Sequence, residues 1–154
     1  MLGLLDLSER VKVKPGGEIR GNSSMSPDKT KRPRVLVLDT ATYQKLFDTI
    51  LGDDYELLAT DQPGEAILIA STESPELILL NHTIDKTDGL SVAKEIRETA
   101  LSIAPMLLML TSDKPTIRRE AKKAGCDGVL IKPIDPDKLK SQLDGWLKKK
   151  DGEQ

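Results

Sequence analysis

The chain has 154 residues, enough for one ordinary domain with its own hydrophobic core, and its 38% apolar and 31% charged residues are typical of a globular protein. No stretch approaches the roughly 20 apolar residues that a membrane helix needs, so the sequence excludes membrane insertion. The net charge of −2 conceals an asymmetry, because residues 1–34 hold eight Lys or Arg against four Asp or Glu, whereas residues 35–154 hold fifteen against twenty-one.

Residues 1–33 are expected to form a basic, largely flexible extension. From Lys14 to Pro33 the chain is rich in Gly, Ser, Pro, Asn and Lys, which bury too little apolar area to offset the entropy of ordering. The extension has no aromatic residue that could stack on a base, so we do not expect nucleic-acid binding.

The start of the extension is apolar, at Leu2, Leu4, Leu5 and Leu7. This start is either a docking peptide or a segment that packs on the domain. It lacks the basic region and cleavage site of a signal peptide, and we expect a cytoplasmic protein.

After Pro33 one pattern occurs five times, a short apolar run followed by a segment of helical period. The runs, expected to be strands covered on both faces, are Val35–Leu38, Tyr55–Ala59, Leu77–Leu80, Met106–Leu110 and Gly128–Ile131. The expected helices cover residues 41–51, 63 to about 70, 88–98, about 114–124 and 136 to about 149. Alternating strands and helices call for right-handed crossovers, and hence for a doubly wound α/β domain over residues 34–149 with a short tail at 150–154.

Several residues mark the ends of the expected helices. Asp88 is a plausible N-cap, Ser112 or Asp113 is expected to cap the helix that begins near Lys114, and Gly125 closes that helix. On the last helix, Trp146 is expected to cover the core together with Leu139, Leu143 and Leu147. Lys148, Lys149 and Lys150 complement the negative end of that helix. The single cysteine, Cys126, is expected to be a small buried residue and excludes an internal disulfide.

Polar residues follow four of the five strands, at the edge of the sheet where such folds place their ligands. They are Asp39 and Thr40, Asn81, Thr111 and Ser112, and Lys132 with Pro133. In this order the chain resembles the receiver domain of two-component response regulators, the CheY-like fold of strand order 2-1-3-4-5. The local matches are residues 35–39, 75–80, 88–90, 110–112 and 124–128 followed by Lys132-Pro133, and their order and spacing make the signal strong.

The resemblance implies a site where two acidic residues after the first strand and one after the third hold Mg²⁺, and where the third-strand aspartate accepts a phosphoryl group. This chain keeps Asp39, but has Thr40 at the second acidic position and Asn81 at the nucleophile. A carboxamide has no ionised oxygen to attack phosphorus, so acyl-phosphate formation is expected to be absent and Mg²⁺ binding weak or absent. The sequence indicates a degenerate pseudo-receiver with no catalytic residue and no metal site.

The resemblance also assigns Thr111 to the hydroxyl that senses phosphate and Lys132 to the ammonium that pairs with it. Without phosphate, we expect Asp39, Asn81, Thr111 and Lys132 to form a standing polar network. Val129 occupies the switch position, where the family usually has an aromatic ring, and a β-branched valine cannot make the same swing. The family also has a cis peptide bond before the proline that corresponds to Pro133.

Two loop residues invite other interpretations. His82 is the only histidine, and a lone loop histidine is more often exposed or hydrogen-bonded than a ligand. Asp85, in the same loop, is a candidate to replace a missing carboxylate of the family's site. Asp88 is a second candidate, although its simpler role is to cap a helix.

The leading functional hypothesis is a phosphorylation-independent signalling adaptor. It would bind a signalling protein through its fourth helix, fifth strand and fifth helix, with residues 1–33 as a possible second contact. No output domain is expected before Pro33 or after Lys150. One alternative is a receiver that still accepts phosphate, at Asp85 or a deamidated Asn81. The other is an atypical receiver that binds a small ligand at the altered pocket.

Overall fold

Five parallel strands form the central sheet, in the order β2-β1-β3-β6-β7. The computed structural model describes residues 32–84 and 86–152, the last four of these as backbone only. The strands are β1 (Arg34–Leu38), β2 (Glu56–Thr60), β3 (Leu77–Asn81), β6 (Met106–Leu110) and β7 (Gly128–Ile131). Counted along the chain this is the order 2-1-3-4-5, which confirms the predicted doubly wound fold.

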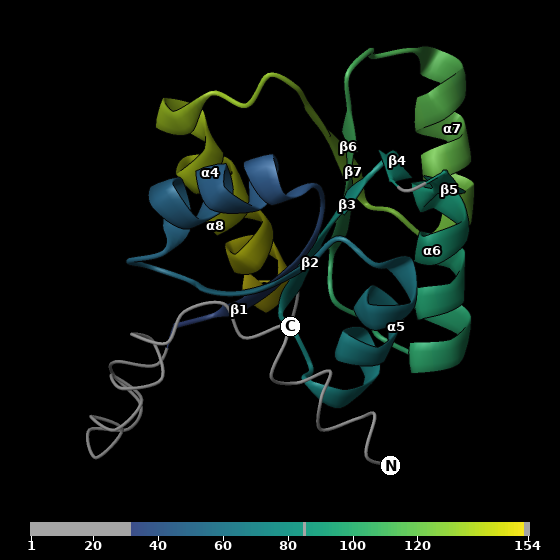
Figure 1. Ribbon diagram of the computed structural model, residues 1–154, viewed down its shortest axis with the longest axis horizontal. Coiled ribbons are helices and arrows are strands. Elements are labelled where there is room, and N and C mark those ends of the chain that lie inside the picture. Colours follow the sequence, from purple (N-terminus) through teal and green to yellow (C-terminus); the bar gives the residue numbers. More distant parts are fainter. Residues whose placement is uncertain (1–31, 85, 153–154) are drawn as a thin grey trace.

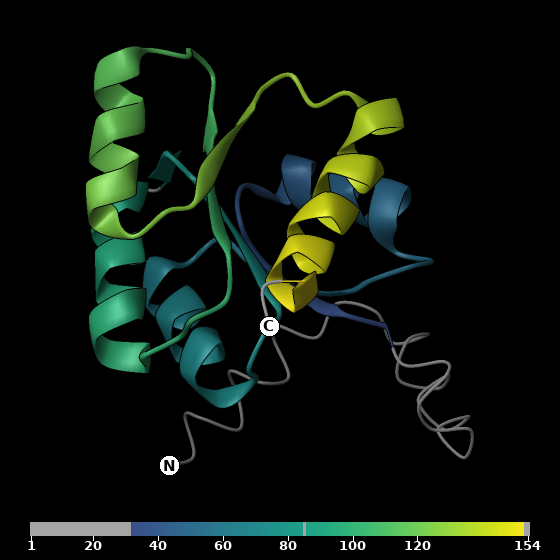
Figure 2. The ribbon, with the colours of Figure 1, turned by 180° about the vertical axis from the view of Figure 1, so that it is seen from behind.

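Helices cover both faces of this sheet, as the crossovers require. Figure 1 shows α4 (Ala41–Leu51) and α8 (Pro136–Gly152) on one face, and α5 (Pro63–Thr72), α6 (Gly89–Glu95) and α7 (Pro115–Ala124) on the other. The view from behind in Figure 2 shows the same two layers. None of the helices in the described ranges is long and apolar enough to cross a bilayer.

The strands are apolar on both faces because each face is covered. Along β1, Leu36 and Leu38 pack into the core beneath α5, α6 and α7, whereas Val35 and Val37 pack into the core beneath α4 and α8. Leu139 and Leu143 are buried in the second core, and Trp146 packs against it as the helical spacing predicted.

Cys126 is buried, as its surroundings in the sequence predicted. Burial raises the pKa of its thiol to about 12, because a thiolate would lose its hydration among apolar neighbours. Burial therefore favours the protonated thiol in the folded domain.

The register of the strands brings their carboxyl ends to one edge. Leu38 pairs with Leu80, Asn81 with Met109, and Leu110 with Ile131. The residues that follow β1, β6 and β7 therefore lie beside Asn81 along the top of the sheet, where the sequence placed the candidate site.

Three features of the fold differ from the prediction. The segment between β3 and α6 is not a plain loop but contains a two-stranded antiparallel hairpin, β4 (Thr83–Ile84) with β5 (Thr87–Asp88). The helix expected to run through Glu98 is α-helical only to Glu95 and continues as a π-helical turn, Ile96–Ala100. The last helix extends to Gly152, past its expected end near Lys149 and into the expected tail.

The expected caps were right for one helix and wrong for another. Asp88 caps α6, accepting a hydrogen bond from the backbone N–H of Leu90 at 2.9 Å. The N-cap of α7 is Lys114 and neither Ser112 nor Asp113. Asp113 instead pairs with Arg118 through two contacts of 2.6 and 2.9 Å, which explains why its carboxylate is not used as a cap.

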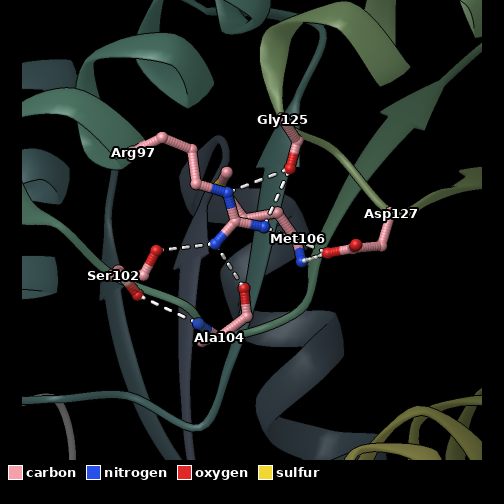
Figure 3. Close-up of polar contacts among 6 residues, drawn as sticks. All are labelled: Arg97, Ser102, Ala104, Met106, Gly125 and Asp127. Atoms are coloured by element: carbon pink, nitrogen blue, oxygen red, sulfur yellow. Dashed lines mark hydrogen bonds and ion pairs between the residues drawn. The ribbon is translucent and has the colours of Figure 1, made fainter.

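At the opposite end of the sheet, one guanidinium joins three segments of the chain (Figure 3). Arg97, on the π-helical turn, donates to the carbonyl of Gly125 and to those of Ser102 and Ala104, the last two at 2.8 Å each. It also pairs with Asp127 at 3.0 Å, and the same carboxylate oxygen accepts the N–H of Met106. Arg97 thus ties the end of α6 to the starts of β6 and β7.

Replacing Arg97 with alanine should lower the free energy of unfolding by about 2–4 kcal/mol, because several carbonyls and one carboxylate lose a charged donor. Urea unfolding followed by Trp146 fluorescence measures the change. Arg118→Ala is the matched control: its ion pair with Asp113 is fully exposed, and only a small change is expected. Equal losses in the two variants would contradict the role assigned to Arg97.

Candidate functional site

Three of the predicted site residues meet above the carboxyl ends of the strands. The ammonium of Lys132, after β7, lies 2.9 Å from Oδ2 of Asp39, after β1. The same ammonium donates to Oδ1 of Asn81, the last residue of β3, at 3.1 Å. These contacts span the sheet, because β3 and β6 lie between β1 and β7.

Lys132 and Asp39 form a buried ion pair. The side chain of Lys132 is 7% exposed and that of Asp39 is 0% exposed. On another side of the ammonium lies the ring of Tyr43 on α4, with its centroid 3.8 Å from Nζ. Each charge has given up most of its hydration, so each depends on the other and on the neighbouring polar and aromatic groups.

Asp39 is held from several directions. Its Oδ1 accepts the backbone N–H of Thr40 at 2.7 Å, which leaves Oδ2 for Lys132. Its own backbone N–H donates to the carbonyl of Thr60, and its carbonyl accepts Nε2 of Gln44 at 2.9 Å. The carboxylate is therefore fixed in position by β2 and by the first turn of α4.

The amide of Asn81 is oriented by two hydrogen bonds. Its Nδ2 donates to the carbonyl of Thr83 at 2.8 Å, at the start of the β4–β5 hairpin. Its Oδ1 accepts from Lys132. A carboxamide offers one donor group and one acceptor, and here the backbone carbonyl takes the donor and the ammonium takes the acceptor.

Two predicted members of the pocket lie outside this network. The expectation that Thr111 belongs to it was wrong: its side chain is exposed, and its hydroxyl makes no hydrogen bond to any residue the structure describes. Thr40 is also exposed and contributes only its backbone, since its hydroxyl makes no capping bond to α4.

The remaining candidates lie nearby. Val129 is partly buried in β7 and packs against the core on the α7 side. The peptide bond between Lys132 and Pro133 is cis, the isomer that the resemblance implied. His82 lies 3.9 Å from the carboxylate of Asp88, and Asp85 falls outside the described residues.

Mg²⁺, which the family resemblance implies, does not fit these residues. Mg²⁺ requires close to six oxygen ligands in octahedral geometry, usually with more than one carboxylate. Asp39 is the one carboxylate in contact with the pocket's ammonium, and that contact uses the oxygen a metal would need. Across residues 32–84 and 86–152, no group of three or more His, Cys, Asp or Glu side chains is placed to hold a metal.

Reasoning from the sequence missed several residues that shape the pocket. Tyr43 supplies the aromatic face, Gln44 anchors the backbone of Asp39, and the carbonyl of Thr83 orients Asn81. The only signal in the sequence was proximity, because Tyr43 lies four residues after Asp39, in the first turn of the helix that begins at Ala41. Gly89 is the fourth residue that was missed. It allows a close approach of two backbone segments, because a Cβ at this position would lie 2.2 Å from the backbone oxygen of Asn81.

Comparisons with known proteins identify the family of the chain. The family model described as the response regulator receiver domain matches residues 35–144. The chain therefore belongs to the family of response regulator receiver domains, which act in two-component signalling. It is similar to Protein PilH of Pseudomonas aeruginosa, with 22% identity over 117 residues that cover 74% of this chain and 97% of that protein.

Other relatives are longer. The chain is 26% identical over 125 residues to a probable transcriptional regulator, ycf27, of Pyropia yezoensis, covering 79% of this chain and 50% of that protein. The chain thus spans about half the length of the first of its curated relatives.

Solved structures show the same fold. A CheY-like receiver domain protein from Methanospirillum hungatei superposes with a TM-score of 0.73 at 18% identity, covering 80% of this chain and all of that one. The chemotaxis protein CheY4 of Vibrio cholerae gives a TM-score of 0.70 at 24% identity, with 75% and 98% covered.

Gly89→Ala should lower the free energy of unfolding by about 1–3 kcal/mol, because the added methyl collides with rigid backbone beside Asn81. Gly64→Ala is the matched control: it lies in the first turn of α5 with nothing within 4 Å of the added carbon. There, alanine should stabilise the helix by roughly 0.5–1 kcal/mol. Chemical denaturation measures both, and a Gly89 variant as stable as the native chain would contradict the close approach.

Proposed function

We propose that this receiver domain is a signalling adaptor that acts by phosphorylation-independent binding to another protein, with no catalytic role. One observation carries the proposal: Asn81, at the family's phospho-acceptor position, is engaged through its amide oxygen by Lys132. The lysine that would neutralise a phosphoryl group is thus already bound to Asp39 and Asn81.

Chemistry supports this proposal. Phosphoryl transfer needs an anionic nucleophile and charge neutralisation around the in-line oxygens. The amide of Asn81 supplies no such nucleophile, and the exposed Thr40 replaces the second acidic residue that would help to hold Mg²⁺. These features support the interpretation of the pocket as a degenerate receiver site.

Val129, at the family's switch position, also supports a role that does not depend on phosphorylation. In the family, an aromatic side chain in the last strand reports the state of the site by changing rotamer. Val129 has one strongly restricted torsion and is packed against the core, so it lacks the reach for such a movement. A binding surface that does not depend on a rotamer change is consistent with both substitutions.

The proposed partner surface comprises α7, β7 and α8. β7 is an edge strand of the sheet, and its Ile131 is 39% exposed although it is a large aliphatic residue. The exposed side of α7 carries four basic residues, Arg118, Arg119, Lys122 and Lys123, and a fifth, Lys114, is its N-cap. An apolar edge beside a basic helix suits a partner that combines an apolar anchor with acidic residues. Residues 1–31, the possible second contact, lie outside the described part of the chain.

The native chain should gain no phosphoryl group when it is incubated with acetyl phosphate and MgCl₂ and measured by intact-mass spectrometry. Asn81→Asp should gain little, since Thr40 leaves the metal site short of charge. The double variant Thr40→Asp/Asn81→Asp is the matched comparison and should be modified more than the single variant. Modification of the native chain would remove the proposal in favour of a receiver that accepts phosphate at another residue.

Ile131→Glu should weaken capture of the physiological partner by tenfold or more, on the order of 1.4–3 kcal/mol, because a charge would be buried at the centre of the interface. Ser71→Glu, an exposed position on α5, is the matched control and should leave capture unchanged. The measurement is affinity purification from the source cells, with the full chain and with residues 1–33 removed. Equal capture by both substituted chains, or loss only on truncation, would move the binding surface away from β7.

A further inference from the structure

The ammonium of Lys132 sits in a cage with three different walls. A carboxylate from the end of β1 lies 2.9 Å away, an amide oxygen from the end of β3 lies 3.1 Å away, and an aromatic face on α4 lies 3.8 Å away. The three walls are Asp39 after β1, Tyr43 at the start of α4, and Asn81 at the end of β3. The side chain of Lys132, which carries the ammonium, comes from the loop after β7.

Each wall suits an ammonium ion. An ammonium has N–H donors and a compact positive charge. Here it donates one hydrogen bond to the amide oxygen of Asn81, while its charge faces the carboxylate of Asp39 and one ring face. A hard divalent cation needs more oxygen ligands, and a ring face supplies none. The composition of the cage therefore discriminates between the two kinds of cation.

Burial makes this cation structurally important. With Asp39 fully buried and Lys132 nearly so, removal of the ammonium would leave an uncompensated carboxylate inside the protein. Such a charge is far more costly than the loss of a surface ion pair.

We propose that the pocket is an internal ammonium site, in which Lys132 is a resident cation that takes the place of the divalent metal ion expected of the family. Tyr43 is the positioning residue that makes the site selective for ammonium. The domain is then complete without Mg²⁺. The inference concerns the cation of the pocket and holds whichever partner the domain binds.

Chemical rescue tests the site directly. Lys132→Ala removes the tethered ammonium and leaves space for a free one, so the variant should melt at least 5 °C below the native chain. Ethylammonium chloride at tens of millimolar should recover part of this loss, because a ligand that binds only the folded state raises the melting temperature. NaCl and tetramethylammonium chloride at equal ionic strength should not, since neither can donate hydrogen bonds. Trp146, the only tryptophan, reports unfolding by fluorescence.

Two matched variants guard against nonspecific effects. Lys138→Ala removes an exposed lysine from α8 and should neither lower the melting temperature appreciably nor create a response to ethylammonium. Tyr43→Leu should lower the melting temperature by roughly 2–6 °C, whereas Tyr43→Phe keeps the ring face and should melt close to the native chain. The tyrosine pair keeps the proposal testable if Lys132→Ala does not fold.

The last measurement uses the native chain. Its melting temperature should be the same in MgCl₂ as in NaCl of matched ionic strength. A rise specific to Mg²⁺ in the native chain would overturn the proposal, as would rescue of Lys132→Ala by Mg²⁺ that exceeds rescue by ethylammonium. A folded Lys132→Ala variant that keeps the native melting temperature, or that no primary ammonium rescues, would also overturn it, as would equal losses in Tyr43→Leu and Tyr43→Phe.

Discussion

The buried ion pair between Lys132 and Asp39 constrains the loops at the carboxyl ends of the strands. The two residues follow strands at separate positions in the sheet, so their contact crosses the ends of β3 and β6 and ties the loop after β7 to the loop after β1. A pair with this little exposure is stable only when its geometry is good and its remaining hydrogen-bonding groups are satisfied. Asn81 accepts a hydrogen bond from the ammonium, the ring of Tyr43 faces it, and the backbone N–H of Thr40 donates to Oδ1 of Asp39. Oδ2 of Asp39 depends on the charge of Lys132 alone, since it accepts no hydrogen bond from the residues that the structure describes.

Much of the fold followed from the sequence because local and tertiary preferences agree. The apolar runs at β1, β3 and β6 are too continuous for a half-exposed strand, and two layers of helices bury them on both faces. The features that escaped prediction depend on contacts distant in sequence or on unusual backbone. The π-helical turn ends at Leu101, whose φ of 53° is one that glycine more often adopts, and no glycine marks the position. Arg97, within the same turn, is held by carbonyls from the segments that lead into β6 and β7.

The candidate site was predictable to the extent that strand ends define it. Asp39, Asn81 and Lys132 are the first polar residues after, or at the end of, their strands, and a parallel sheet gathers such residues at one edge. Thr111 satisfies the same rule and yet points to solvent, since position after a strand fixes the Cα but not the direction of the side chain. Tyr43 and Thr83 act through a ring face and a backbone carbonyl, which no polar-residue pattern identifies.

At each end of the sheet, one basic side chain links loops that flank β7, but the groups that it contacts differ. At the amino ends of β6 and β7, Arg97 binds backbone carbonyls and Asp127; at the carboxyl ends, Lys132 binds a carboxylate, an amide and a ring. The planar guanidinium reaches several carbonyls at once, whereas the compact ammonium fits a small cage. Both cations hold loops that flank β7, so this edge strand and its helices are fixed from above and below. Under the proposed adaptor role, a surface held in this way would lose little conformational entropy on binding a partner, and the proposal therefore favours recognition by a preformed shape over recognition by a switch.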